Sequence, residues 1–197
     1  VLHLRYQLER YIEKSPDFAT SITPVEEDEL MPEIALLMSR AAKKAGVGPM
    51  AAVAGAISEM VGRMLSEKTG EVIVENGGDI FVNCRRDITV GIYAGDSPLS
   101  NKIGIKLKKS GMPAGVCTSS GTIGHSYSMG RADAVVILSA SAALSDAAAT
   151  AVGNRILSGK DIPAGIEAAK NIKGVTGALI IVGNRIGAWG QVELTEI

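Results

Sequence analysis

Apolar positions spaced by three and four residues predict helices in the first third of the chain. A short amphipathic helix is expected over residues 4–14, because Pro16 disfavours its continuation. Residues 22–33 carry an acidic cluster and two prolines, which indicates a connector leading into a helix near Pro32. The strongest helical stripe continues to Thr69 and contains Met50, Val53, Ala54, Ile57, Met60, Val61, Met64 and Leu65.

Beyond residue 70 short β-branched segments separated by turn residues predict strands. They favour an antiparallel meander and cover residues 71–84, 88–94, 102–110 and 115–120. A strand over 133–139 leads to Ser145, a good N-cap for a helix over 146–157. A last helix near 163–171 precedes a hairpin with Gly183-Asn184 at its turn. This order of elements predicts an α+β fold rather than alternating βαβ units.

Length and composition narrow the class of protein. With 197 residues, 46% of them apolar, we expect one domain, with N-terminal helices and a connector over 1–47 and the sheet, cleft and hairpin over 48–197. Twenty basic and 21 acidic residues give a net charge of -1 without a basic block, which argues against nucleic acid as a partner. Two separated cysteines argue against a disulfide framework or a cysteine-rich zinc site and favour a cytoplasmic setting. No apolar stretch approaches the roughly 20 residues that cross a bilayer, so no membrane partner is expected.

The first candidate site is ENGGD at residues 75–79, between two apolar strand segments. Paired glycines permit left-handed dihedral angles or the close approach of a ligand to the backbone. The segment therefore predicts either the lining of a binding cleft or a simple β-bulge or sharp bend.

The second candidate is GVCTSSGTIGHS at residues 115–126, where a strand runs into small hydroxyl residues and glycines. Such a segment can cradle a phosphate or another anion, or form an ordinary polar loop. Cys117 and His125 could act as nucleophile and base, because a thiolate beside an imidazolium is activated. The alternative is that Cys117 is an inert, buried cysteine.

The third candidate is the helix segment 145–154, in which Asp146, Thr150 and Asn154 share one face. A carboxylate and a hydroxyl one turn apart at a helix N-terminus can hold a Mg²⁺ ion that keeps its waters and binds substrate phosphates. The same spacing is also typical of the outer, solvated stripe of an amphipathic helix.

Together these segments resemble the ApbE-like superfamily of FAD:protein FMN transferases, in order as well as in content. That family has a glycine-containing loop opening a helix, a GGD, a TSG and an AD-x-x-x-TA motif. The counterparts here are GPMAAVAGA at 48–56, GGD at 77–79, TSSG at 118–121 and SDAAATA at 145–151. The resemblance implies a duplicated α+β fold of T-fold-like halves, with mostly antiparallel sheets and packed helices around a central cleft.

The resemblance also implies site residues and cofactors. Asp146, Thr150 and the Ala51 carbonyl would hold Mg²⁺, with the pyrophosphate of FAD or another flavin nucleotide beside the metal. The cleft for this nucleotide or small-molecule ligand would be lined by residues of the two glycine-containing motifs, namely Gly77, Gly78, Asp79, Thr118, Ser119, Ser120 and Gly121.

The chain departs from the transferases at two places. Ala54 stands where they have a lysine before the glycine, and residues 124–136 lack their D-P-x-T-G sequence, which argues against covalent flavinylation of a partner protein. The pattern is closer to the ApbE-like branch of anaerobic archaea and bacteria, for which a link to sulfur-amino-acid synthesis has been suggested.

Three functions follow as alternatives. The first is an enzyme that uses Mg²⁺ to act on a phosphorylated small molecule or nucleotide. The second is a non-catalytic ligand-binding or assembly component, and the third is sulfur or acyl chemistry with Cys117 as nucleophile and His125 as base. Strand edges and small surface residues also favour a homodimer.

Overall fold

The apolar stripes form helices where their spacing predicts them. The computed structural model describes residues 1–121 and 130–197. Its α-helices are α1 (Leu2–Lys14), α2 (Asp17–Thr20), α3 (Glu33–Ala45), α4 (Val53–Thr69), α5 (Ala142–Gly153) and α6 (Ile162–Lys170). The stripe that begins at Met50 is split, because its first turn forms the 3-10 helix η1 (Pro49–Ala52). A second 3-10 turn, η2, covers Lys109–Gly111.

The strands build two antiparallel sheets instead of one meander. The larger sheet has the order β1 (Val72–Asn76), β2 (Asp79–Asn83), β5 (Ala114–Ser119), β6 (Ala134–Ser139), β7 (Val175–Val182) and β8 (Arg185–Gly190). The smaller sheet has the order β3 (Ile88–Gly91), β4 (Ile103–Leu107) and β9 (Glu193–Glu196). The predicted meander is therefore wrong in its order, because β2 pairs with β5 and the hairpin β3–β4 leaves to join β9.

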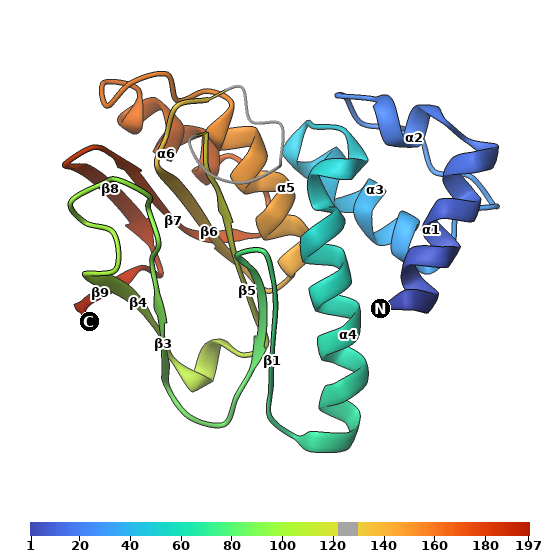
Figure 1. Cartoon of the computed structure of the whole chain (residues 1–197), viewed down its shortest axis with the longest axis horizontal. Coiled ribbons are helices and arrows are strands. Elements are labelled where there is room, and N and C mark those ends of the chain that lie inside the picture. The colour runs from blue at the N-terminus through green and yellow to red at the C-terminus, as the bar shows by residue number, and fades with distance from the viewer. Residues whose placement is uncertain (122–129) are drawn as a thin grey trace.

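Burial on both faces of the larger sheet explains this departure. Every residue of β6 is buried, and its side chains alternate between two apolar clusters. Val135 and Ile137 pack against the helical layer, whereas Val136 and Leu138 face the smaller sheet. Figure 1 shows the resulting layers, with helices on one face of the larger sheet and β3, β4 and β9 on the other. The α+β class with antiparallel sheets and packed helices is thus confirmed.

Helix α5 begins earlier than the sequence predicts. Its N-cap is Ser141, whose Oγ accepts the Leu144 N–H at 3.3 Å, and the helix ends at Gly153 rather than at residue 157. The predicted cap, Ser145, is buried inside the helix, and its Oγ donates to the Gly115 carbonyl. The alanines that precede Ser145 are strong helix formers and extend the helix backwards. Asp146 therefore lies more than one turn inside α5 and not at its N-terminus.

Among the described residues no single helix has the length and apolarity to cross a membrane. The segments Glu33–Ala45 and Pro49–Thr69 meet that criterion only as a pair, across a bend of 103°.

Candidate functional site

A cavity of about 650 Å³ lies where the two sheets meet α5. It is bounded by the β1–β2 turn, the ends of β3 and β5, the start of α4 and one face of α5. The lining residues are Ala54, Glu75, Asn76, Gly77, Gly78, Asp79, Ile80, Val90, Gly91, Tyr93, Thr118, Ser119, Ser120, Asp146 and Thr150. A second cavity of about 460 Å³, beside Lys106, Lys108 and Glu193, contains none of the predicted site residues.

Gly77 and Gly78 form the tight turn that carries the chain from β1 to β2. Their φ angles are +65° and +98°, and the flanking residues Asn76 and Asp79 are paired across the hairpin. A Cβ atom on either glycine would meet nothing within 4 Å, so backbone conformation and not crowding calls for glycine here. The sharp-bend interpretation is therefore correct for the backbone, and the same turn also lines the cavity.

Asp79 begins β2 and is an acid with an unfilled hydrogen-bonding position. Only 8% of the surface of Asp79 is exposed, and its Oδ1 atom is buried without a hydrogen-bond partner among the described residues. Burial raises the pKa of Asp79 to about 7. A buried carboxylate in this state is stabilised by a proton or by a bound cation.

Asp146 reaches the same cavity from α5. Its Oδ2 accepts the Gly55 backbone N–H at 2.8 Å. Burial raises the pKa of Asp146 well above its usual range, and the negative charge of Asp79 raises it further. A Cβ on Gly55 would lie 2.3 Å from the Ala142 carbonyl oxygen, so glycine lets α4 approach α5 closely enough for this bond.

The electrostatics of the cavity favour a cation over a free anion. Glu75, Asp79 and Asp146 line it, and the described lining contains no lysine, arginine or histidine. Thr150 adds a hydroxyl one helical turn beyond Asp146. Within residues 1–121 and 130–197 no group of three or more His, Cys, Asp or Glu side chains could hold a metal ion by itself. A cation here would therefore keep water or ligand oxygens in its coordination shell, as Mg²⁺ prefers.

Most of the predicted site residues meet in this cavity. They are Gly77, Gly78, Asp79, Thr118, Ser119, Ser120, Asp146 and Thr150. Ala51 lies in η1 and does not line the cavity, although Ala54 does. Gly121 is also outside the lining, and its N–H donates to the Ala132 carbonyl. His125 lies outside the described residues.

Cys117 does not have the environment of a nucleophile. Its residue is 0% exposed, and it packs with Phe81 and Ala142. The thiol donates to the Ala142 carbonyl oxygen at 3.2 Å, and burial raises its pKa well above the usual value. An activated cysteine needs an accessible thiol with a lowered pKa. The predicted catalytic role of Cys117 is therefore corrected to that of a buried cysteine.

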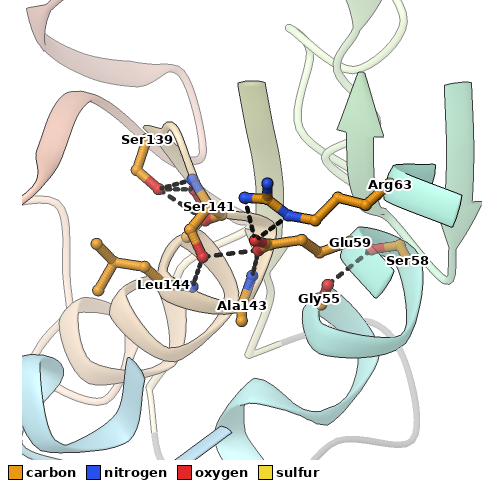
Figure 2. A network of polar contacts seen from close by, with 9 residues as sticks. Gly55, Ser58, Glu59, Arg63, Ser139, Ser141, Ala143 and Leu144 are labelled. Atoms are coloured by element: carbon orange, nitrogen blue, oxygen red, sulfur yellow. Dashed lines mark hydrogen bonds and ion pairs between the residues drawn. The ribbon is translucent and has the colours of Figure 1, made fainter. Parts of the chain in front are cut away.

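Glu59 is a residue that the sequence pattern did not single out. Figure 2 shows its carboxylate between α4 and the start of α5. The residue is 2% exposed, and its Oε1 pairs with Arg63 at 2.7 Å. Its Oε2 accepts the Ser141 hydroxyl at 2.7 Å and the Ala143 N–H at 3.2 Å. The sequence does contain a signal for a buried, paired glutamate. Glu59 lies inside an apolar helical stripe, four residues after Gly55 and four before Arg63.

Known proteins similar to this chain were found by sequence and by structure. The family model described as "AbpE bacteria" matches residues 1–194. The UPF0280 protein of Methanococcus maripaludis strain C6 is 45% identical over 197 residues, which cover 98% of this chain and 80% of that protein. The UPF0280 protein of Methanopyrus kandleri strain AV19 is 49% identical over 194 residues, with 95% and 78% covered.

The apo crystal structure of the Pseudomonas stutzeri flavinyl transferase ApbE matches with a TM-score of 0.49 and 16% identity. That match covers 74% of this chain and 48% of the transferase, about half of its length. The family assignment comes from the sequence matches, which extend over nearly the whole chain. This protein belongs to the ApbE-like family described as AbpE bacteria, and the UPF0280 proteins of archaea are its relatives.

Proposed function

We propose that this protein is an enzyme that binds Mg²⁺ together with a phosphorylated nucleotide or small molecule in the cavity between the sheets and α5. The observation that carries the proposal is the buried Oδ1 of Asp79, which has no hydrogen-bond partner among the described residues. Asp146 and Thr150 line the same cavity, so the donor set is two carboxylates and a hydroxyl. Oxygen donors of this kind fit Mg²⁺.

Each group of the cavity has a part in this function. Asp146, Thr150 and the unpartnered oxygen of Asp79 would hold the metal. When bound, the ion supplies charge neutralisation and orientation of the phosphate. The hydroxyls of Thr118 and Ser119 would donate to phosphate oxygens, and the Gly77-Gly78 turn leaves space for a ligand at the backbone. The cavity volume of about 650 Å³ is in the range of small-molecule sites.

The acidic lining of the cavity and membership of the ApbE-like family together indicate the class of ligand. Because the described lining is acidic, a phosphate would bind mainly through the cation and only weakly without it. Ala54 lines the cavity where the transferases have a lysine, so a fixed positive charge is replaced by a methyl group. We include FAD or another flavin nucleotide among the ligands on the strength of family membership, and we exclude protein flavinylation from the proposal.

The experiment is thermal unfolding with Mg²⁺ and FAD, FMN or ADP, separately and together. Wild-type protein should be stabilised by about 1.4 kcal/mol at a ligand concentration ten times the dissociation constant. Asp146→Asn should lose this stabilisation. Asp96→Asn is the matched control, because it removes the same charge at an exposed position away from the cavity. If no ligand changes the unfolding temperature and Asp146→Asn binds as wild type does, the proposal is wrong.

A second function is favoured by the lining itself, which offers no basic side chain among the described residues. The protein would then be a ligand-binding or assembly component without turnover. Incubating the identified ligand with catalytic amounts of protein separates the two functions. Consumption of the ligand establishes the enzyme, whereas tight binding of an unchanged ligand establishes the binding component.

A further inference from the structure

We propose that Glu59 is a positioning residue for the cavity, which holds α5 against α4 so that Asp146 and Thr150 keep their places. This inference rests on the proposed metal site. Glu59 does not line the cavity and is 2% exposed, so it has no direct contact with a ligand there. Its effect on binding passes through the helix that it holds.

The first step of the argument is the contact with the N-terminus of α5. Glu59 Oε2 accepts from the Ser141 hydroxyl and from the Ala143 N–H. Ser141 Oγ in turn accepts the Leu144 N–H, so the carboxylate and the N-cap together accept two N–H groups of the first turn of α5 (Figure 2). A negative charge at this end also interacts favourably with the helix dipole. The first turn of α5 is thereby tied to a side chain of α4.

A second contact lies farther along α5. Gly55 and Glu59 are one turn apart on α4, and the Gly55 N–H donates to Asp146 Oδ2 at 2.8 Å. Helix α4 therefore holds α5 at two points, at its first turn and at the carboxylate that faces the cavity. Contacts on two different turns restrain both the shift of α5 along its axis and its rotation. Metal ligation needs its groups placed to about 0.5 Å, so loss of one contact affects the other.

Arg63 explains why a carboxylate, and not an amide, occupies position 59. Its guanidinium binds Glu59 Oε1 and lies 5.9 Å from the centre of the Phe81 ring. Oε1 thus accepts from Arg63 while Oε2 accepts from α5, and both oxygens must be acceptors. A glutamine would turn an NH₂ group toward one of these donors. Glu59→Gln therefore keeps the size of the side chain but loses the hydrogen bonds either to Arg63 or to the N-terminus of α5.

The test uses metal-free protein and Mn²⁺ alone, whose binding is measured by electron paramagnetic resonance. Glu59→Gln should raise the Mn²⁺ dissociation constant about tenfold, as second-layer substitutions at metal sites do. Amide hydrogen exchange at Gly55 should become faster in the same variant without metal, while circular dichroism shows an intact fold. Glu67→Gln, an exposed acid on the same helix, is the matched control and should change neither quantity.

A double variant separates positioning from simple destabilisation. Adding Arg63→Gln to Glu59→Gln replaces the opposing donor by an acceptor, so the amide oxygen can turn to Ala143. Mn²⁺ affinity should recover to within about threefold of wild type. No recovery would mean that the loss came from general weakening of the fold.

The outcomes for the two proposals are distinguishable. If wild-type protein does not bind Mn²⁺, the proposed metal function fails, and Gly55 exchange in metal-free protein still decides the role of Glu59. If Glu59→Gln matches Glu67→Gln in both measurements, the positioning role is wrong. Should Glu59→Gln not fold, Ser141→Ala removes the hydroxyl that donates to Glu59 and accepts the Leu144 N–H, and leaves the Ala143 N–H on Glu59. It should shift both quantities in the same direction by a smaller factor, and no shift would overturn the inference.

Discussion

Glu59 and Asp79 are both buried acids, with 2% and 8% of their surfaces exposed, but their surroundings differ. The oxygens of Glu59 accept from a guanidinium, a hydroxyl and a backbone N–H. Asp79 Oδ1 accepts from nothing in the described part of the chain. Because an unpartnered buried polar atom is costly, a fully bonded acid indicates a structural contact, and an incompletely bonded one indicates a place for a ligand or a proton.

Removing the Glu59 side chain should have the largest effect of the changes that test this contrast between Glu59 and Asp79. Glu59→Ala should lower the free energy of unfolding by about 3 kcal/mol, because two charged hydrogen bonds and the support of the α5 N-terminus are lost. Chemical denaturation measures this value. Asp79→Asn in metal-free protein at neutral pH should cost far less or be stabilising. Equal losses in the two variants would remove the distinction between the two acids.

Crowding between α4 and α5 gives the next largest effect. Gly55→Ala should lower the free energy of unfolding by about 2 kcal/mol, because the new Cβ would lie 2.3 Å from the Ala142 carbonyl oxygen. It should also weaken the bond from Gly55 to Asp146 and thus reduce Mn²⁺ binding. Gly111→Ala is the control, since a Cβ there meets nothing within 4 Å and no positive φ is involved. A loss no larger than in this control would show that the helices can separate without cost.

The pH dependence of stability examines Asp79 directly. Its pKa is about 7 in the folded protein against 3.8 for an ordinary aspartate, so the folded state binds more protons between these values. Stability should therefore be highest below about pH 4 with respect to this group, fall by roughly 1.4 kcal/mol per pH unit between about pH 4 and pH 7, and level off above pH 7. Asp79→Asn should reduce the slope by its own share, with the remainder coming from Asp146, whose pKa burial also raises, and Mg²⁺ should restore stability at pH 8 but not at pH 5. The free energy of unfolding of both proteins is measured by denaturant titration across this pH range. If wild type and Asp79→Asn showed the same change with pH, the raised pKa of Asp79 would be contradicted.

The smallest effect is expected at Cys117, which neighbours Asp79 across the β2–β5 pairing. Cys117→Ala should change Mg²⁺ and nucleotide affinity by less than about twofold, since the buried thiol donates to the Ala142 carbonyl and its contact with Asp79 is a weak sulfur hydrogen bond. Calorimetric titration measures the affinity. Native Cys117 should also react with an alkylating reagent much more slowly than free cysteine. Rapid alkylation, or a large loss of ligand binding in Cys117→Ala, would make Cys117 a candidate nucleophile again.

The helices could be predicted because their signal is local. The rows of apolar residues in α3 and α4 lie within one or two turns of each other, so spacing alone identifies them. Sheet order has no such signal. The apolar run Ile80–Val82 indicates a strand but not that its partner is Ala114–Ser119, across an intervening hairpin. The start of α5 differs from the prediction because Ser141 and Ser145 are equally good caps by residue type, and only packing decides between them.

The motifs, rather than residue spacing, indicate the candidate site. Asp146 and Thr150 could equally have formed a solvated stripe, and it is the contact of α5 with α4 and the β1–β2 turn that brings them to the cavity. Glu59 was missed because glutamate in a helix is usually exposed. Its burial depends on Arg63 and on the N-terminus of a helix far along the chain, which no local pattern contains.

The pairing of β4 with β9 has a consequence for synthesis on the ribosome. Strands β3 and β4 are synthesised before β5 to β8, but their third strand, Glu193–Glu196, follows every other strand of the structure. A two-stranded hairpin alone is marginally stable in water. Val90 and Gly91 of β3, which line the cavity, should therefore reach their final positions only after β9 has been synthesised, when the helices of the other layer have already been made.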